Sequence, residues 1–202
     1  MMKNKFQKLI AVISLSFSLV YFSCNSGYHP EIQKRGYFRI NLPEKKYRQF
    51  DQPGYPYTFE YPVYASIVKD TTFFDVKADP WWINIDFPGF GGRIYISYKE
   101  VGKNKLDSLV NDAFEMSYKQ HTYKASSIEP TEIHTPNHVH GIYFTLAGNT
   151  ATANQFFLTD STKHFLRGAL YFDATPNEDS LSIVNSFLKK DLVHLINTLK
   201  WK

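Results

Sequence analysis

The pattern of hydrophobic and polar positions divides the chain into an apolar leader, a strand-rich part, a helix, a second group of strands and a last helix. Tyr57–Tyr61 alternates aromatic and polar side chains, which is the period of a half-buried strand. Aromatic and β-branched residues also predict strands over 37–40, 63–68, 81–87 and 93–98. We expect the last two to pair as a hairpin across the glycine-rich loop 88–92.

The period then changes to that of a helix. From Leu106, apolar residues recur at Leu109, Val110, Ala113 and Phe114, which predicts a helix with one face on the core. Asn104 is the expected N-cap, and Lys119, His121 and Lys124 are cations expected near the C-terminal end, where the helix dipole favours them.

A second group of strands is predicted over 142–146, 155–159 and 163–172, with a hairpin between the first two. The last helix is expected to start with Thr175 as cap, Pro176 in the first turn and Glu178 completing a capping box. Its apolar stripe runs through Leu181, Val184, Leu188, Leu192, Leu195 and Leu199.

The order strands, helix, strands, helix lacks the alternation of a parallel sheet and predicts an α+β fold, an antiparallel sheet with helices packed on it. This order, with its ending Thr-Leu-Lys-Trp, resembles the Mog1/PsbP-type α/β/α sandwich. Known proteins of that fold are mostly binding or assembly factors, but a shared fold implies no function by itself.

The leader has the pattern of a secretory signal. Lys3, Lys5 and Lys8 precede an apolar stretch over 9–22, which is too short for the ~20 residues of a transmembrane helix. It ends at Ser23-Cys24, a small residue before a cysteine, as a lipoprotein signal peptidase requires, although Tyr21 stands where leucine is commonest. We expect residues 1–23 to be removed and Cys24 to carry a covalent lipid, with further acylation by a fatty acid such as palmitate.

Cys24 is the only cysteine, which excludes an intrachain disulfide, a second thiol nucleophile and a zinc-thiolate site. Residues 24–35 are polar and predict a tether, and residues 36–202 predict a single domain. The net charge of +4 falls to +1 once the three signal lysines are removed. A nearly neutral body disfavours nucleic-acid binding, which needs a concentrated basic face.

The histidines are the first candidates for chemistry. His134, His138 and His140 lie near Glu129 and Glu132, and imidazoles at this spacing could bind zinc or copper. Nothing in the sequence brings all three together, and a solvated connection between strands explains them better. We therefore predict no metal ligands and no cofactor other than the lipid.

Other chemical motifs are weak. The loop 88–92 lacks the lysine and the following helix of a phosphate-binding loop. The chain contains no nucleophile elbow. Four aspartates are acid–base candidates in number only, and surface charge explains them better: Asp70, Asp75, Asp79 and Asp86. We predict no catalytic residues.

Aromatic residues make up 17% of the chain, which favours a β-rich core and a surface that contacts other proteins. Adjacent residues of a strand point to opposite faces, so one of Trp81 and Trp82 is expected in the core and the other under a helix or at a contact surface. The predicted partner-binding residues are Trp81, Trp82, Phe90, Tyr55 and Tyr57.

Four segments resemble the D-type gliding-motility lipoproteins (GldD-like) of gliding gram-negative bacteria: Gly36–Pro43, Lys46–Tyr47, Tyr57–Pro62 and Trp81–Ile85. The similarity extends from the predicted lipidated cysteine to the last helix. It implies an accessory lipoprotein of the gliding apparatus, coupled to type IX protein secretion, with motility and secretion proteins as partners. It implies no catalytic residues.

Because residues 25–28 lack an acidic cluster, we predict a domain anchored in the outer membrane and facing the periplasm. The main hypothesis is a non-catalytic subunit or assembly factor. The first alternative is a periplasmic lipoprotein that binds a small ligand or carbohydrate by stacking on Trp81 or Trp82. The second is a metal-dependent hydrolase that uses the histidine segment.

Overall fold

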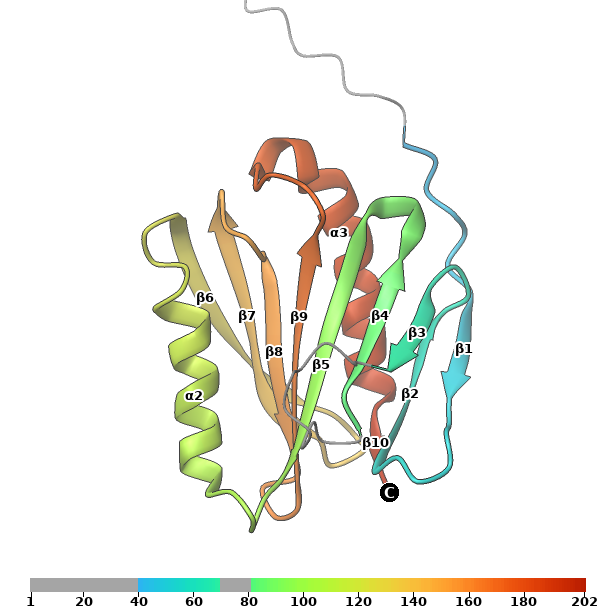
Figure 1. The fold of residues 1–202 in the computed structure, drawn as a ribbon, viewed down its shortest axis with the longest axis vertical. Helices are drawn as coiled ribbons and strands as arrows, with labels where there is room; N and C mark the ends of the chain where they lie inside the picture. The colour runs from blue at the N-terminus through green and yellow to red at the C-terminus, as the bar shows by residue number, and fades with distance from the viewer. Residues whose placement is uncertain (1–39, 70–80) are drawn as a thin grey trace, which may run out of the picture. The chain divides into compact units, whose positions relative to one another are not determined.

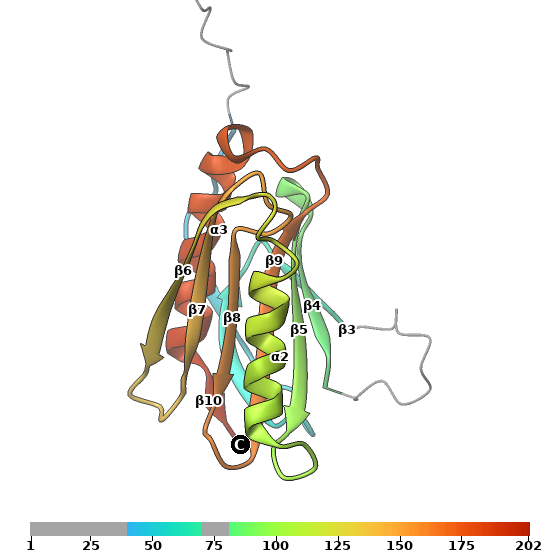
Figure 2. The ribbon, with the colours of Figure 1, turned by 90° about the vertical axis from the view of Figure 1, so that its left-hand side faces the viewer.

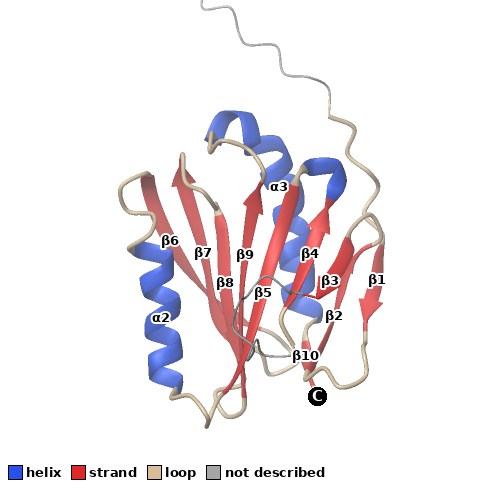
Figure 3. Cartoon of the chain, viewed as in Figure 1, coloured by secondary structure: helices blue, strands red, loops and turns tan. Residues whose placement is uncertain are grey.

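Two antiparallel sheets and two α-helices make up the part of the chain that the computed structural model describes, residues 40–69 and 81–202 (Figures 1 and 3). Residues 40–202 form one compact unit. The large sheet has the strand order β3 (Ser66–Lys69), β4 (Ile83–Phe87), β5 (Gly92–Glu100), β9 (His164–Phe172), β8 (Asn154–Thr159), β7 (His140–Gly148) and β6 (Ala125–His134). The small sheet has the order β1 (Tyr47–Phe50), β2 (Tyr57–Pro62) and β10 (Lys200–Trp201). The helices are the 3-10 turn η1 (Pro88–Phe90), α2 (Leu106–Tyr118) and α3 (Glu178–Thr198).

The two α-helices lie on opposite faces of the large sheet, as the alternation along β8 shows. Phe156 and Leu158 belong to the core under α3, whereas Phe157, between them, belongs to the core under α2. Figure 1 shows α3 behind β4 and β5, and Figure 2 shows α2 in front of the β8–β9 region. The predicted α+β class and its α/β/α layering are therefore confirmed.

The chain connection explains why α2 covers only part of its face. β5 lies in the middle of the large sheet and β6 lies at its edge, so α2, which connects them, must cross β9, β8 and β7. Leu109 and Ala113 of α2 pack on Phe144, Phe157 and Phe165 of these strands. On this face, none of the described helices covers the half formed by β3, β4 and β5.

The other face carries the main core. Leu188, Leu192 and Leu195 of α3 are at most 2% exposed and pack against the large sheet on one side. The small sheet contributes Tyr57 and Phe59 to the same core. Because both sides of α3 are covered, the helix needs a broader apolar face than a surface helix has.

A buried polar network fixes the segment before β1 to α3. The Asp191 carboxylate is 2% exposed and accepts hydrogen bonds from Lys45 Nζ (2.6 Å), the Tyr64 hydroxyl (2.5 Å) and the Tyr47 hydroxyl (3.0 Å). Lys45 Nζ also donates to the Phe187 carbonyl at 3.0 Å and lies over the Phe187 ring. Burial lowers the pKa of Lys45, although the hydrogen bond to Asp191 and its charge act in the opposite direction. Burial and the hydrogen bond to Asp191 both raise the pKa of Tyr47, to about 12.

Most predicted strands are confirmed, and the 88–92 loop does connect a hairpin of β4 and β5. The strand predicted from Trp81 begins instead at Ile83, because residues 81 and 82 lie in a turn and an irregular position. The prediction over 63–68 is shortened to β3, since Val63 and Tyr64 form part of a turn. Of the predicted strand 37–40, Ile40 is irregular and residues 37–39 lie outside the described residues.

The predicted helix caps were wrong. α2 follows Lys105 without a side-chain cap, and the Asn104 amide donates to the Glu100 carbonyl instead. The cations predicted near the end of α2 do lie there: the helix ends at Tyr118, Lys119 is its C-cap residue, and His121 and Lys124 follow in the next turn. α3 is capped by Asn177, whose side chain accepts from the Ser180 N–H at 2.9 Å, and Thr175 lies outside the helix.

Candidate functional site

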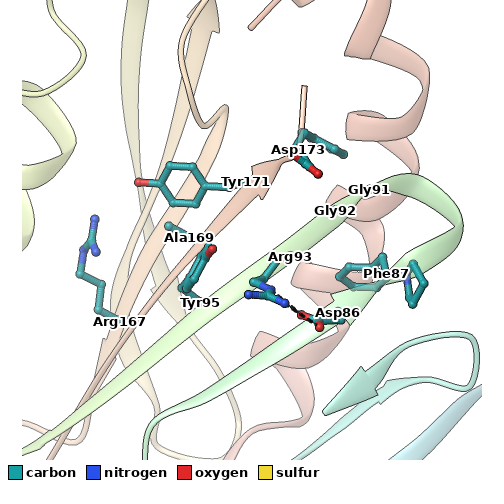
Figure 4. A pocket seen from close by; sticks show the side chains of 12 residues that line it. Asp86, Phe87, Gly91, Gly92, Arg93, Tyr95, Arg167, Ala169, Tyr171 and Asp173 are labelled. Carbon is teal, nitrogen blue, oxygen red and sulfur yellow. Dashed lines mark hydrogen bonds and ion pairs between the residues drawn. The ribbon is translucent and has the colours of Figure 1, made fainter. Parts of the chain in front are cut away.

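The half-face of β4, β5 and β9 that no described helix covers is the candidate functional site. The strand register places its side chains in rows. Asp86 of β4 lies opposite Arg93 of β5, which in turn lies opposite Tyr171 of β9. Asn84 of β4 lies opposite Tyr95 of β5, and Ser97 of β5 lies opposite Arg167 of β9. Of these residues, Asp86, Arg93, Tyr95, Arg167 and Tyr171 line an open concavity of about 850 Å³ at the end of the sheet that carries η1 (Figure 4). We call this surface the open face.

An ion pair and an aromatic pair occupy its centre. Arg93 donates to Asp86 through Nε and Nη2 at 2.6 and 2.9 Å, a two-pronged contact that raises the pKa of Arg93. Tyr95 meets Tyr171 edge to face, with ring centroids 5.6 Å apart. The Tyr95 side chain is 41% exposed, so this arrangement offers both an aromatic surface and charged groups to a partner.

Arg167 lies across Tyr95 from the Arg93–Asp86 pair, on the side toward α2 (Figure 4). Its Nη2 donates to Gln155 Oε1 at 2.6 Å, and none of the ion pairs among residues 40–69 and 81–202 includes it. Burial lowers the pKa of Arg167, although an arginine stays protonated at neutral pH. Burial and the charge of Arg167 also lower the pKa of His121, which is 6% exposed.

A second hollow, of about 230 Å³, continues the open face toward α2 and shares Tyr95 and Arg167 with it. We call it the α2 crevice. Leu109, Ala113 and Met116 of α2 form one wall, and Phe165 of β9 forms part of the other. The crevice therefore combines apolar walls with a cationic group.

Apart from Trp82, the predicted partner-binding residues line neither the open face nor the α2 crevice. Trp81 and Trp82 are half-buried, and their indole N–H groups donate to the Gly54 and Tyr98 carbonyls, each at 2.8 Å. Of the pair, only Trp82 lines the α2 crevice. Because neither tryptophan is in a strand, the expected division between two sheet faces does not apply to them.

The other three predicted residues are packed on the opposite side of the sheet. Tyr57 is 0% exposed and belongs to the main core, so a partner cannot reach its ring in this structure. Tyr55 is half-buried against Phe50. Phe90, also predicted to bind a partner, is half-buried against Phe187 of α3, with ring centroids 5.5 Å apart.

The histidine segment is the hairpin of β6 and β7, and His134 and His138 are exposed, as expected for a solvated connection between strands. His134 and His140 lie opposite each other on β6 and β7, with their Nδ1 atoms 3.1 Å apart, and His138 lies in the turn with a positive φ of 57°. Glu132 Oε2 is 3.3 Å from His134 Nε2. Within the described residues, no three histidine, cysteine, aspartate or glutamate side chains are placed to hold a metal ion.

Several predictions fall outside the described residues: Cys24, the signal over 1–23, the tether, Asp70, Asp75 and Asp79. Asp86, the fourth acid–base candidate, is paired with Arg93. In the described ranges, no helix is long and apolar enough to cross a membrane.

Sequence reasoning missed Tyr95, Arg167 and Tyr171 as site residues. A signal was present, because an arginine in the middle of the apolar strand His164–Phe172 needs a polar surrounding. What the sequence could not give is the pairing of β5 with β9, which brings Tyr95 beside Tyr171 and Ser97 beside Arg167.

A family model for the gliding motility lipoprotein GldD matches residues 28–201. The chain belongs to this family. Membership confirms the resemblance found in the sequence and makes the chain a gliding-motility lipoprotein of the cell envelope, in a family of motility lipoproteins rather than of known enzymes.

Two further comparisons add little. No match is found among curated proteins. Among solved structures, the solution structure of cyanobacterial PsbP (CyanoP) from Synechocystis sp. PCC 6803 is similar over 80% of this chain and 95% of that chain, with 9% identity and a TM-score of 0.44. A likeness this distant supports no inference about function.

Proposed function

We propose that the chain is a non-catalytic, lipid-anchored subunit or assembly factor of the gliding apparatus, coupled to type IX secretion, and that it binds a protein partner through the open face. Its lipid is on Cys24, and its domain faces the periplasm from the outer membrane. The family match carries the motility role. The open face supports the docking role, because it offers tyrosine and arginine side chains, which are enriched at protein interfaces.

The surface chemistry favours binding over catalysis. Asp86, one of the two carboxylates that line the open face, accepts two hydrogen bonds from Arg93, which leaves it poorly suited to act as a free base. His121 is buried in the turn that follows α2, and the paired histidines His134 and His140 lie on β6 and β7, at the far edge of the large sheet. Within the described residues, no serine, threonine, cysteine or histidine lines the concavity of the open face, so a nucleophile for its second carboxylate, Asp173, is not provided there.

The alternative of a carbohydrate or small-ligand protein depended on Trp81 or Trp82 as a stacking platform. Both rings are half-buried and both indole N–H groups are bound to backbone carbonyls, which weakens that support. The exposed Tyr95 is a better platform, but its neighbours are two arginines, so we favour the protein partner.

Photo-crosslinking in living cells tests the proposal. A photoreactive amino acid at Tyr95 should capture a motility or secretion protein, and Tyr95→Ala combined with Arg93→Ala should reduce cell spreading. The matched control is the same probe at Val193 of α3, because Val193 and Tyr95 are both 41% exposed. Capture of the same proteins from both positions, or normal spreading of the double variant at wild-type protein level, would contradict docking through the open face.

A further inference from the structure

The α2 crevice carries a cation that the described protein does not neutralise. Arg167 donates to the neutral Gln155, and Ser117, which lies beside Gln155, is 1% exposed and donates to the Ala113 carbonyl. Gln155, also 1% exposed, has a side-chain nitrogen without a hydrogen-bond partner among the described residues. Arg167 is half-buried and has no carboxylate partner among the described residues, so a bound anionic group would compensate the cost of its partial desolvation.

The rest of the lining defines the chemistry of that group. Lys99 and Arg167 are cations and Asp112 is the one carboxylate in the lining, so the crevice favours a negative charge. Its walls are apolar, formed by Leu109, Met116 and Phe165, which suits a hydrocarbon side chain better than sugar hydroxyls. A volume of about 230 Å³ accommodates one or two side chains rather than a folded surface.

We propose that the α2 crevice binds an acidic segment of a protein partner, with an aspartate or glutamate side chain on Arg167 and a neighbouring apolar side chain against Leu109 and Met116. The planar guanidinium can offer two parallel N–H groups to a carboxylate, which a lysine cannot do. This inference rests on the proposed docking function and adds the chemistry of the partner.

The open face extends the same contact. Tyr95 lines both the α2 crevice and the larger concavity, so a segment seated on Arg167 continues over Tyr95 toward Tyr171. Met116 is 46% exposed at the opposite rim, and its flexible side chain can adapt to different apolar side chains. Arg167 then selects a partner segment with a negative charge, and Met116 at the rim accommodates apolar side chains of different shapes.

Binding of short peptides to the full chain tests the proposal. The probes are alanine peptides with blocked termini that carry leucine followed by glutamate, and the controls replace glutamate by glutamine. We expect the glutamate peptide to bind at concentrations below about 1 mM and the glutamine peptide to bind ~10–100-fold more weakly, the factor for a hydrogen bond to a charged group. Equal binding of the two peptides, or no binding of either, would overturn the proposal.

Variants locate the binding. Arg167→Met should abolish the preference for glutamate while keeping or raising the midpoint of thermal unfolding, because it removes a half-buried charge that has no ion pair. Arg167→Lys should retain part of the preference, since the charge remains without the planar fork. The control Arg48→Met removes an exposed cation of β1, outside the crevice, and should leave the preference for glutamate unchanged. An unchanged preference in Arg167→Met would overturn the assignment, and if that variant does not fold, the peptide contrast on the wild type still decides.

Other occupants are distinguishable outcomes. Preference for a free peptide carboxyl terminus over the blocked glutamate peptide would overturn the assignment to an acidic side chain. Peptide binding that appears only when Asp70, Asp75 and Asp79 are replaced by Asn would assign the crevice to this chain's own segment and overturn the proposal. If the Tyr95 crosslink persists in Arg167→Met cells, docking stands and the acidic-segment inference fails; if Tyr95 captures nothing even in the wild type, docking itself fails.

Discussion

Removal of the buried carboxylate of Asp191 is expected to destabilise the fold strongly, because this one side chain joins the segment before β1 to α3. Asp191→Ala removes the acceptor of three hydrogen bonds, those from Lys45, Tyr47 and Tyr64. It also leaves Lys45 as a partly buried cation without its ion pair.

The magnitude follows from burial. Breaking a buried ion pair from one side typically costs about 3–5 kcal/mol. The Lys45 side chain is 25% exposed and can turn its ammonium toward water, which favours the lower end, about 3 kcal/mol. Since domains are stable by only about 5–15 kcal/mol, this is a large fraction of the free energy of unfolding.

Urea unfolding of the purified protein, followed by circular dichroism, measures the effect. A loss of about 3 kcal/mol should lower the urea midpoint by roughly 1–3 M, given the usual slopes of about 1–3 kcal/mol per M. The matched control is Asp112→Ala, an exposed aspartate of α2, which should change stability by no more than about 0.5 kcal/mol.

A double variant removes both charges of the ion pair at once. Lys45→Met with Asp191→Leu removes both charges and keeps apolar volume, so it should be more stable than Asp191→Ala. A loss below about 1 kcal/mol for Asp191→Ala, or a double variant that is no more stable than that single variant, would refute the reasoning.

Three further predictions concern other parts of the molecule. The pKa of Tyr47 is raised from 10.0 to about 12, so the contribution of this tyrosine to stability is complete below pH 10 and is lost as the pH rises through about 12. Unfolding midpoints measured between these pH values should therefore fall, and they should fall less steeply in Tyr47→Phe. Gly168→Ala places a Cβ within 2.3 Å of the buried Phe156 ring, so calorimetry should show that the free energy of unfolding falls by about 1–3 kcal/mol. The control Gly89→Ala, whose new Cβ meets nothing within 4 Å, should lower it much less. Cys24→Ala should move the protein from the membrane to the soluble fraction and remove the added lipid mass measured by mass spectrometry. A variant that stays membrane-bound would contradict lipid anchoring.

The sequence by itself determined the elements whose periodicity is strong. The alternation in Tyr57–Pro62 and the leucine stripe of α3 each require one buried face, so β2 and α3 were predictable within a few residues. The family was also determined by sequence, since the model matches residues 28–201.

Elements with weak patterns were decided by their neighbours. β6 carries mostly exposed polar residues and Pro130, which an edge strand tolerates, and only pairing with β7 makes it a strand. β1 and β10 are four and two residues long, and each is a strand because it pairs with β2.

The candidate site shows the same division. The sequence determines that Arg167 is a charge within an apolar strand and that Tyr95 alternates with buried isoleucines. Only the tertiary structure determines what surrounds them, because β5 and β9 are distant in sequence and pair at the middle of the large sheet. The crossing of α2 over one half of that sheet then decides which side chains are buried and leaves Arg167 at the border, beside an apolar wall and an open face.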